Sequence, residues 1–366
     1  MTLIDFGHLS SRILHTAVLQ VNPKVDKTLG KFNTNDWASM YVHLLLKNLS
    51  YLKMKFEAEY GEIVICVDNK ENWRKDVYPD YKGNRAKKRS ESNIDYSTFY
   101  ELQDDILNEL DLNFPFKVIK VDKCEADDIV GVLAKEYAKY EKTVVVSSDK
   151  DFKQVLEYGA KLFDPIAKVF VNMSSDELKE WKIEHILGGD DGDNIPNIKQ
   201  HTEFTEEFRK YLGEVGVYKD IPVHEFLEMK MADDLFKKYN IYEVYTAGKL
   251  KGQLKDTKKI FKMIPFGEKN IYKFAKNLNE NLNSNILYKK YYDRNAQLVL
   301  FENIPTDIKN TIIEKVKVVE NKYNPSGIMN LFSRFMLIEL MKSASDFYYT
   351  PKQTKNPYNS PVNEWL

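Results

Sequence analysis

The sequence predicts an α/β fold, in which a central, mostly parallel β-sheet is flanked by helices and followed by a mainly helical region. Short apolar runs rich in β-branched residues alternate with longer amphipathic segments over the first 170 residues. The hydrophobic content of 43% over 366 residues is enough to bury a sizeable core. After Gly188 the strand-like runs fade, and Lys- and Asn-rich segments with helical spacing follow.

Each element has its own signal. Apolar runs that match the length of strands predict β-strands at 3–6, 63–68, 116–121, 143–147 and 160–163. Between them, Asp36 can cap a helix whose apolar residues recur at helical spacing, and further helices are expected at 97–113 and 125–140. Another helix is expected to begin at Ser174, where Glu177 completes a capping box, and to run to Leu187.

These signals predict two domains and a tail. We expect an α/β domain over 1–187 and a mainly helical domain over 188–347 that contains an insertion at about 201–262. Pro351, Pro357 and Pro361, with several Asn and Ser residues around them, predict a flexible tail over 348–366.

Composition excludes several classes of protein. Cys66 and Cys124 are the two cysteines and form no Cys/His cluster, which argues against a zinc ribbon or a disulfide framework. No apolar run approaches the roughly 20 residues that cross a bilayer, and a strand-like segment directly after Met1 leaves no room for a signal peptide. We therefore expect a cytoplasmic protein without a membrane partner.

The net charge of −1 hides two basic stretches. Residues 70–89 hold eight Lys and Arg against three acids, and residues 249–276 hold nine Lys against two acids. Separation of basic surface from acidic groups is typical of an enzyme that acts on a polyanion.

Carboxylates follow most of the predicted strands. In a parallel sheet the carboxyl ends of the strands lie on one edge, so these side chains are expected to converge. A further acidic loop, GDDGDN, follows the helix that ends near Leu187. The groups are Asp5; Asp68; Glu125, Asp127 and Asp128; Asp149 and Asp151; and Asp190 and Asp193.

Crowded carboxylates repel one another unless a cation lies among them. Oxygen-only ligands favour Mg²⁺, with Mn²⁺ as a substitute, and two such ions about 4 Å apart could activate water for phosphodiester cleavage. Each acidic group taken alone also has a structural explanation as a helix-dipole partner, an N-cap or a turn. It is their joint occurrence that favours a metal site.

The motifs in their order resemble the 5′ nuclease superfamily of flap endonucleases and 5′-to-3′ exonucleases, with a PIN-like nuclease fold. They are LIDFGH at 3–8, VDN at 67–69, YKGNR at 81–85, EADD at 125–128, SSDKD at 147–151 and GDDGDNIP at 189–196. The resemblance is strongest to phage members of the ribonuclease H type, which remove RNA primers. It implies a two-metal enzyme that hydrolyses phosphodiester bonds near the 5′ ends of DNA and RNA:DNA hybrids, at nicks or flaps, during phage DNA replication.

The resemblance also implies a role for each acid. A first ion would lie around Asp5, Asp68, Glu125, Asp127 and Asp149, and a second toward Asp151, Asp190 and Asp193. Asp128 matches the last acid of its motif and would act through water. Asp68 and Asp149 are the acids whose loss should abolish cleavage.

Residues 70–100 match the helical arch of this family, through or beneath which the 5′ strand passes. Lys82 and Arg85 would contact the scissile phosphate and act in catalysis, and Tyr81 could stack on a terminal base. In the helical domain, Lys269 in Phe266-Gly-Glu-Lys could supply part of a duplex-binding hairpin, or it could be a surface lysine. Nonspecific phosphate attraction is expected from Arg74, Lys75, Lys87, Lys88 and Arg89.

The expected partners are nucleic acids, and the expected state is a monomer. The tail could dock on a sliding clamp or a single-strand DNA-binding protein, or it could lack a partner. Two alternatives to this function stay open: a PIN-type ribonuclease, although such domains lack the YKGNR and GDDGDNIP segments, and a catalytically inert junction-binding scaffold of the replisome.

Overall fold

The computed structural model describes residues 1–21, 34–92, 94–239, 242–244, 254–256, 260–262 and 264–348. They divide into two compact units. The first unit comprises Met1–Pro79, Gly83–Leu178 and the chain from Leu300, and the second comprises Asp80–Lys82 and Lys179–Val299.

A six-stranded sheet with the order β3-β2-β1-β4-β5-β6 forms the middle of the first unit. The strands are β1 (Thr2–Asp5), β2 (Ile63–Val67), β3 (Lys117–Lys120), β4 (Val144–Val146), β5 (Lys161–Asp164) and β6 (Val169–Val171). The first five are parallel and confirm the predicted strands, whereas β6 runs antiparallel to β5 and was not predicted. Its three apolar residues are a run too short to indicate a strand, and in the structure they are mostly exposed.

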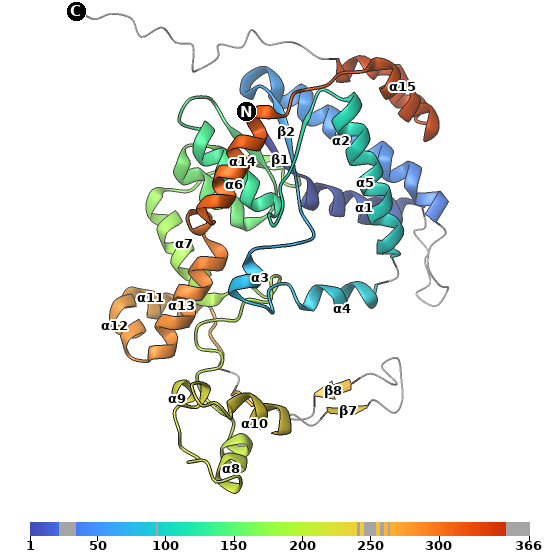
Figure 1. Cartoon of the computed structure of the whole chain (residues 1–366). Coiled ribbons are helices and arrows are strands. Elements are labelled where there is room, and N and C mark those ends of the chain that lie inside the picture. Colours follow the sequence, from blue (N-terminus) through green and yellow to red (C-terminus); the bar gives the residue numbers. More distant parts are fainter. Residues whose placement is uncertain are drawn as a thin grey trace, which may run out of the picture. The chain divides into compact units, whose positions relative to one another are not determined.

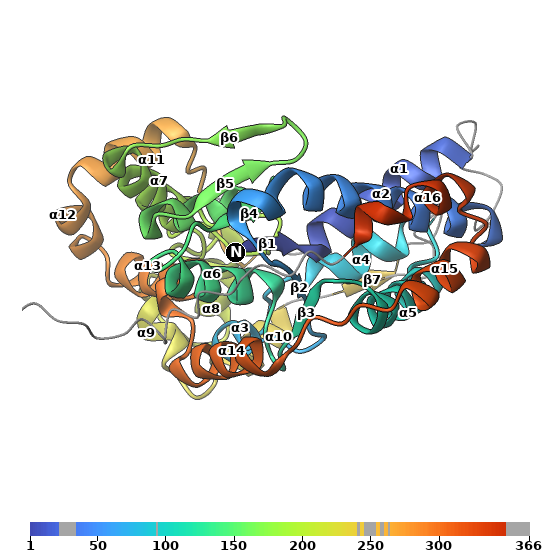
Figure 2. The ribbon, with the colours of Figure 1, turned by 90° about the horizontal axis from the view of Figure 1, so that it is seen from above.

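Both faces of the sheet are covered by helices (Figure 2). One core joins Ile4, Ile65 and Val146 to α1 (Phe6–Val21), α2 (Thr34–Tyr60), α5 (Tyr96–Asn113), α15 (Pro325–Arg334) and α16 (Ile338–Lys342). The other joins Leu3, Val64 and Val145 to α6 (Ala126–Tyr137) and α14 (Thr306–Val318). Because side chains alternate along a strand, a strand that is buried on both faces needs the continuous apolar run seen in the sequence.

Local capping explains where several helices begin. The Asp95 side chain accepts from the amides of Ser97 and Thr98 at the start of α5. At α7 (Ser175–Gly188), the Ser174 amide donates to Glu177 (2.7 Å) and the Glu177 amide donates to Ser174 Oγ (3.2 Å), which confirms the predicted capping box. Helix α1, which follows Asp5 directly, was not predicted.

The chain passes from β2 to α5 through α3 (Arg74–Val77) and α4 (Asn84–Ser90) (Figure 1). These two short helices occupy the segment that was expected to form the arch. Most of the basic residues of this segment lie on α3 and α4 or next to them.

The second unit is mainly helical. It contains α7 from Lys179 onward, together with α8 (Glu206–Glu214), α9 (Val223–Leu227), α10 (Ala232–Tyr239), α11 (Glu268–Lys276), α12 (Leu278–Asn283) and α13 (Ile286–Val299). It also contains a small sheet of β7 (Tyr242–Val244) and β8 (Leu254–Asp256). Its core is rich in aromatic residues; Phe204, Phe208 and Phe226, for example, pack with ring centroids 4.9–5.8 Å apart. Part of the expected insertion therefore belongs to the common core of the second unit.

The division of the chain differs from the expected one. Residues from Leu300 onward return to the first unit instead of completing the helical domain. The Phe301 amide in η2 (Phe301–Asn303) donates to Gln154 Oε1 (3.0 Å), and a Cβ at Gly131 in α6 would lie 2.7 Å from the Phe301 ring. The final helix, η3 (Ala344–Phe347), also packs in this unit. The tail from 349 lies outside the described residues.

We expect Phe301→Ala to destabilise the protein by about 3–5 kcal/mol, because a buried ring that fits against α6 would leave a cavity. Urea unfolding measures the loss. The matched control is Val318→Ala at the end of α14, where the side chain is 72% exposed and a change of about 0.5 kcal/mol or less is expected. Equal stabilities for the two variants would contradict the assignment of this segment to the first unit.

Candidate metal centre

Three neighbouring strands deliver acids to one edge of the sheet. Asp5 is the last residue of β1, Asp68 follows β2, and Asp149 lies three residues after the end of β4. β1 pairs in parallel with both β2 and β4, so the three carboxyl ends lie side by side. The predicted convergence is therefore present in the first unit.

Contacts show how close these acids come. A Cβ at Gly7 would lie 2.5 Å from Asp68 Oδ2 and 3.7 Å from Asp5 Oδ1, so glycine leaves room for both carboxylates. Ser147 Oγ donates to Asp5 Oδ2 (3.0 Å) and accepts from the Asp149 amide (3.1 Å). Ser147 thus connects the acid of β1 to the acid after β4.

The buried Asp5 carboxyl carries the electrostatic cost of this arrangement. Burial is the largest cause of a raised pKa, the charges of Asp68 and Asp149 also raise it, and hydrogen bonds from the His8 amide and Ser147 lower it, so that the pKa of Asp5 is about 7. The Cys66 thiol senses the same field: burial raises its pKa, and Asp5, Asp127 and Asp68 add to the rise. Asp127 therefore belongs to the same cluster of charge.

The start of α6 brings in the EADD motif. Asp68 Oδ1 accepts from the Ala126 amide at the first turn of the helix (2.8 Å), where the helix dipole favours a negative charge. Asp127 lies in the same turn and is half-buried. The Asp68 carboxylate is thus held in place by both the strand and the helix.

Asp128 and Arg74 form a buried ion pair, which differs from the roles predicted for them. Arg74 is 3% exposed and Asp128 is 0% exposed, and their ion pair measures 2.8 Å. Asp128 Oδ2 also accepts from Trp73 Nε1 (3.1 Å) and from the Glu125 amide (3.0 Å). With these partners, Asp128 fastens α3 to α6 and does not fit a direct or water-mediated metal ligand. Arg74 likewise does not fit an exposed phosphate contact.

Glu125 is only partly committed to this network. Its Oε2 lies 3.4 Å from Arg74 Nη1, a longer contact than that of Asp128. The side chain is buried at the start of α6. Glu125 therefore stays a predicted ligand.

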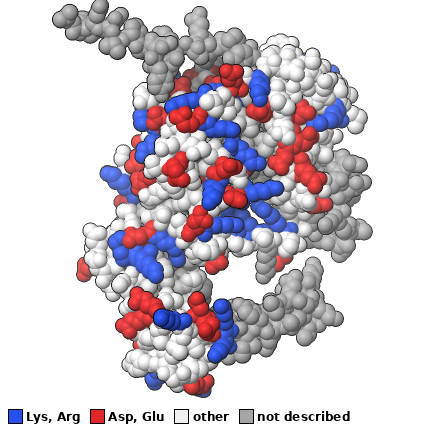
Figure 3. Space-filling model, viewed as in Figure 1, with Lys and Arg blue, Asp and Glu red and all other residues white. Residues whose placement is uncertain are grey.

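Basic residues of the arch segment lie within reach of the acidic cluster. Tyr100 shows this, because burial raises its pKa, Arg89 and Arg85 lower it, and Asp68 raises it. The Arg89 guanidinium lies 5.4 Å from the Tyr100 ring centroid. Arg85 and Lys75 are exposed, and nothing is described for the side chains of Lys87 and Lys88. Figure 3 shows Lys and Arg side chains interspersed with Asp and Glu side chains on the face drawn.

Tyr81 also differs from its predicted role. The ring is 2% exposed, and its hydroxyl donates to Asp193 Oδ2 (2.8 Å) within the second unit. A buried ring with this hydrogen bond does not fit a stacking platform for a terminal base. Lys82 lies beside it, with Nζ 3.5 Å from the same oxygen.

The GDDGDN loop holds the acids of the second unit. The Asp193 amide donates to Asp190 Oδ1 (3.1 Å), and an isolated bridge pairs Asp190 with Ile195. Gly189 adopts a φ of 70°, and a Cβ there would lie 2.3 Å from the Ile195 carbonyl oxygen. Glycine is therefore required for this tight turn.

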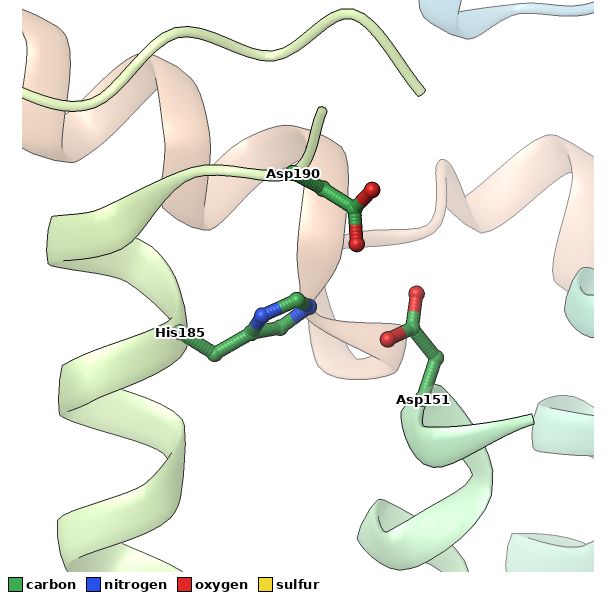
Figure 4. Close-up of side chains that lie close together, drawn as sticks. All are labelled: Asp151, His185 and Asp190. Atoms are coloured by element: carbon green, nitrogen blue, oxygen red, sulfur yellow. The ribbon is translucent and has the colours of Figure 1, made fainter. Parts of the chain in front are cut away.

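His185 was not predicted from the sequence. It lies on the last turn of α7, it is buried, and one of its ring nitrogens lies within 4.8 Å of an Asp190 carboxylate oxygen (Figure 4). The Trp181 ring stacks on it at 5.1 Å between centroids. The available signal was a histidine five residues before the first acid of the loop, which alone is too common to single out.

Two further predicted site residues, Asp151 and Lys269, each lie in the first turn of a helix. Asp151, drawn in Figure 4, lies in the first turn of η1 (Lys150–Tyr158), where its amide donates to Asp149 Oδ1 (3.0 Å). Lys269 is exposed in the first turn of α11. Lys269 belongs to the basic stretch 249–276, of which residues 249–253, 257–259 and 263 lie outside the described residues. The role of Lys269 in binding a duplex stays a prediction.

The residues of the first unit fit a divalent cation. A buried carboxyl with a raised pKa beside two further acids has an excess of negative charge that a cation would offset, and all donors are hard oxygens. Asp5, Asp68, Asp127 and Asp149 are the residues that would hold it.

Comparison with known proteins shows the family to which this chain belongs. Residues 1–184 match the family described as the 5′-3′ exonuclease, N-terminal resolvase-like domain. The chain belongs to this family. Among described residues, no helix has the length and apolarity to span a membrane.

Individual relatives match only part of the chain. Ribonuclease H of Enterobacteria phage T4 is 33% identical over 207 residues, which cover 55% of this chain and 64% of that protein. Flap endonuclease Xni of Shewanella sp. (strain MR-4) is 29% identical over 160 residues, covering 40% and 58%. Both matches span less than two thirds of the relative. A solved structure of the T5 D15 protein co-crystallised with metal ions aligns with a TM-score of 0.49 at 16% identity, covering 87% of this chain and 99% of that one.

We expect Arg74→Ala to lower the stability by about 3–5 kcal/mol, because it leaves the buried Asp128 carboxylate without its counter-ion. Chemical unfolding measures this. Lys75→Ala removes the neighbouring exposed cation and is expected to cost about 0.5 kcal/mol or less. A stable Arg74→Ala protein that binds DNA poorly would restore the phosphate-binding role.

A second prediction concerns pH. The pKa of Asp5 in the folded protein lies above its ordinary value of 3.8, so the metal-free protein binds an extra proton on folding and loses stability as the pH rises from about 4 to 7. Asp5→Asn cannot ionise. In EDTA the stability of Asp5→Asn relative to the wild type should therefore increase as the pH rises from about 4 to 7, by at most about 4 kcal/mol above pH 7.

Asp164→Asn provides a control of opposite sign. Burial raises the pKa of Asp164, but hydrogen bonds from Ser148 and from the Ala167 and Ile166 amides outweigh it and leave the pKa below its ordinary value. Removing this carboxylate should cost stability at neutral pH, and the cost should shrink as the pH falls. Urea unfolding at several pH values tests both variants. A difference between Asp5→Asn and the wild type that does not vary with pH would contradict the raised pKa.

Proposed function

We propose that this chain is a divalent-metal-dependent 5′ nuclease that hydrolyses phosphodiester bonds near the 5′ ends of nucleic acid strands. The observation that carries the proposal is the convergence of Asp5, Asp68 and Asp149 at adjacent strand ends, where their charges add to burial in raising the pKa of Asp5 to about 7. Membership of the 5′-3′ exonuclease family supports it.

The proposed first ion is Mg²⁺, or Mn²⁺ in its place, held by Asp5, Asp68, Asp127 and Asp149, with Glu125 as a further ligand. Such an ion lowers the pKa of bound water and stabilises charge on phosphoryl oxygens. In the hydrolysis one water is consumed: its oxygen bonds to phosphorus, the bond from phosphorus to the leaving oxygen breaks, and the leaving oxygen ends as a hydroxyl.

The chain's own residues supply orientation. The Ala126 amide and the start of α6 hold Asp68, and Ser147 holds Asp5 while accepting from the Asp149 amide. The side chains of Asp5 and Asp68 are therefore held in place by hydrogen bonds, which keeps the cost of reorganisation low. We further propose that Lys82 and Arg85 meet the charge on the scissile phosphate.

For a second ion we propose Asp190 and Asp193, which share one loop, with His185 as an added nitrogen donor beside Asp190. Asp151 is kept in this set on its sequence motif alone. A second ion held there would add to the stabilisation of charge on the phosphate.

For the substrate, we propose 5′ flaps, nicks and RNA:DNA hybrids, with removal of RNA primers during phage DNA replication as the biological role. The similarity to a protein named Ribonuclease H from a phage, and to a protein named flap endonuclease, supports this choice. The basic residues of the arch segment suit a polyanionic strand without regard to its sequence.

We expect Asp149→Asn to lose cleavage by about three orders of magnitude or more, because it removes a charged ligand from the ion that activates water. Digestion of 5′-labelled nick, flap and RNA:DNA substrates with Mg²⁺ measures this. Binding of the same substrates, followed by fluorescence anisotropy, should be retained.

Asp104→Asn is the matched control, since it makes the same change on the exposed surface of α5 and should cleave like the wild type. Cleavage by Asp149→Asn at the wild-type rate would remove this acid from the site. A wild-type protein that binds these substrates and cleaves none of them would favour the inert scaffold.

A further inference from the structure

A three-residue turn, Asp80–Lys82, is fastened to the loop that carries Asp190 and Asp193. The Asn194 side-chain amide donates to the Asp80 carbonyl, and the Lys82 backbone amide donates to the Asp193 carbonyl, both at 2.8 Å. The turn groups with the second unit although the chain up to Pro79 and from Gly83 groups with the first. Contacts with the loop therefore determine where the turn lies.

Asp193 is the centre of these contacts. Its Oδ2 accepts from the Tyr81 hydroxyl at 2.8 Å and lies 3.5 Å from Lys82 Nζ. The Lys82 ammonium also lies 5.0 Å from the centroid of the buried Tyr81 ring. One carboxylate oxygen thus has a neutral donor and a cation on it at once.

The backbone shows that this arrangement is imposed. Lys82 has a φ of 55° and Asn194 a φ of 60°, in the left-handed region that residues other than glycine seldom adopt. Such conformations persist where surrounding contacts hold them, and they gather at functional sites. Each of these two left-handed residues donates a hydrogen bond between the turn and the loop.

We propose that Asp193 is shared between Lys82 and a divalent cation. In the metal-free protein the Lys82 ammonium neutralises Asp193, and a cation at the Asp190–Asp193 loop displaces that ammonium. Tyr81 keeps its hydrogen bond to Asp193 and so holds the turn in place; it is a positioning residue. This inference rests on the proposed function, which places an ion at this loop.

The physical reason is competition for one carboxylate. An ammonium and a divalent cation on the same oxygen repel each other, so binding of one weakens binding of the other. The ammonium that leaves Asp193 carries a charge that a substrate phosphate would accept. Because the coupling is reciprocal, a phosphate that draws Lys82 away should tighten cation binding by the same factor.

Cation affinity tests the competition. With Asp149→Asn as the parent protein, which weakens the first ion, Mn²⁺ binding is measured by calorimetry. Lys82→Met should bind Mn²⁺ about fivefold more tightly or better, and Lys82→Arg should keep the parent affinity. Lys75→Met, an exposed lysine outside the turn, is the control and should also keep it.

Tyr81→Phe tests the positioning role. It keeps the buried ring but removes the hydroxyl, so the turn holds Lys82 less firmly on Asp193. The gain in Mn²⁺ affinity from Lys82→Met should therefore be smaller when Tyr81→Phe is also present. An equal gain in both backgrounds would show that Tyr81 does not position Lys82.

Labelling of the full-length wild-type chain needs no substitution. Acylation by an amine-reactive ester, read by mass spectrometry, should increase at Lys82 when Mn²⁺ is added and stay constant at Lys75. If the protein cleaves DNA and binds Mn²⁺ while Lys82 labelling and the Lys82→Met affinity are unchanged, the shared carboxylate is overturned and the proposed function stands. A wild-type protein that neither binds Mn²⁺ nor cleaves would overturn the proposed function itself.

Discussion

Repulsion among carboxylates at one edge of a parallel sheet is the constraint on which the rest of the molecule depends. Parallel pairing of β2, β1 and β4 sets their carboxyl ends side by side, and Asp5, Asp68 and Asp149 come with them. Hydrogen bonds from Ser147 and the His8 amide offset only part of the cost, since the pKa of Asp5 is still raised to about 7. The proposed cation would offset this cost.

Several features far from the acids serve to keep this edge in shape. Helices on both faces of the sheet fix the strands, and the return of the chain after Leu300 closes the core under α6. The buried Arg74–Asp128 pair ties α3 to the same helix, whose first turn bonds Asp68. Asp128 of the EADD motif thus supports the helix, whereas Asp127 contributes charge to the cluster and Glu125 stays a predicted ligand.

The sequence predicted what depends on local pattern. Five strands, the capping box at Ser174 and the meeting of Asp5, Asp68 and Asp149 follow from periodicity and from the geometry of parallel sheets. The prediction was wrong where a residue distant in the sequence determines whether a side chain is buried. Arg74 and Tyr81 were predicted as exposed residues of a basic stretch. In the structure Arg74 is buried against Asp128, 54 residues away, and Tyr81 is buried with its hydroxyl bonded to Asp193, 112 residues away. The return of the chain at Leu300 likewise has no local signal, because the helices before and after it share one pattern.

The most direct test of the account is crystallographic location of the cation. Crystals grown or soaked with Mn²⁺ at neutral pH, measured near the manganese absorption edge, should show an anomalous peak within coordination distance of the Asp5, Asp68 and Asp149 oxygens. A peak there would show that the acidic edge is a metal centre. The absence of any peak at that position, in crystals of protein that binds Mn²⁺ in solution, would contradict the central claim.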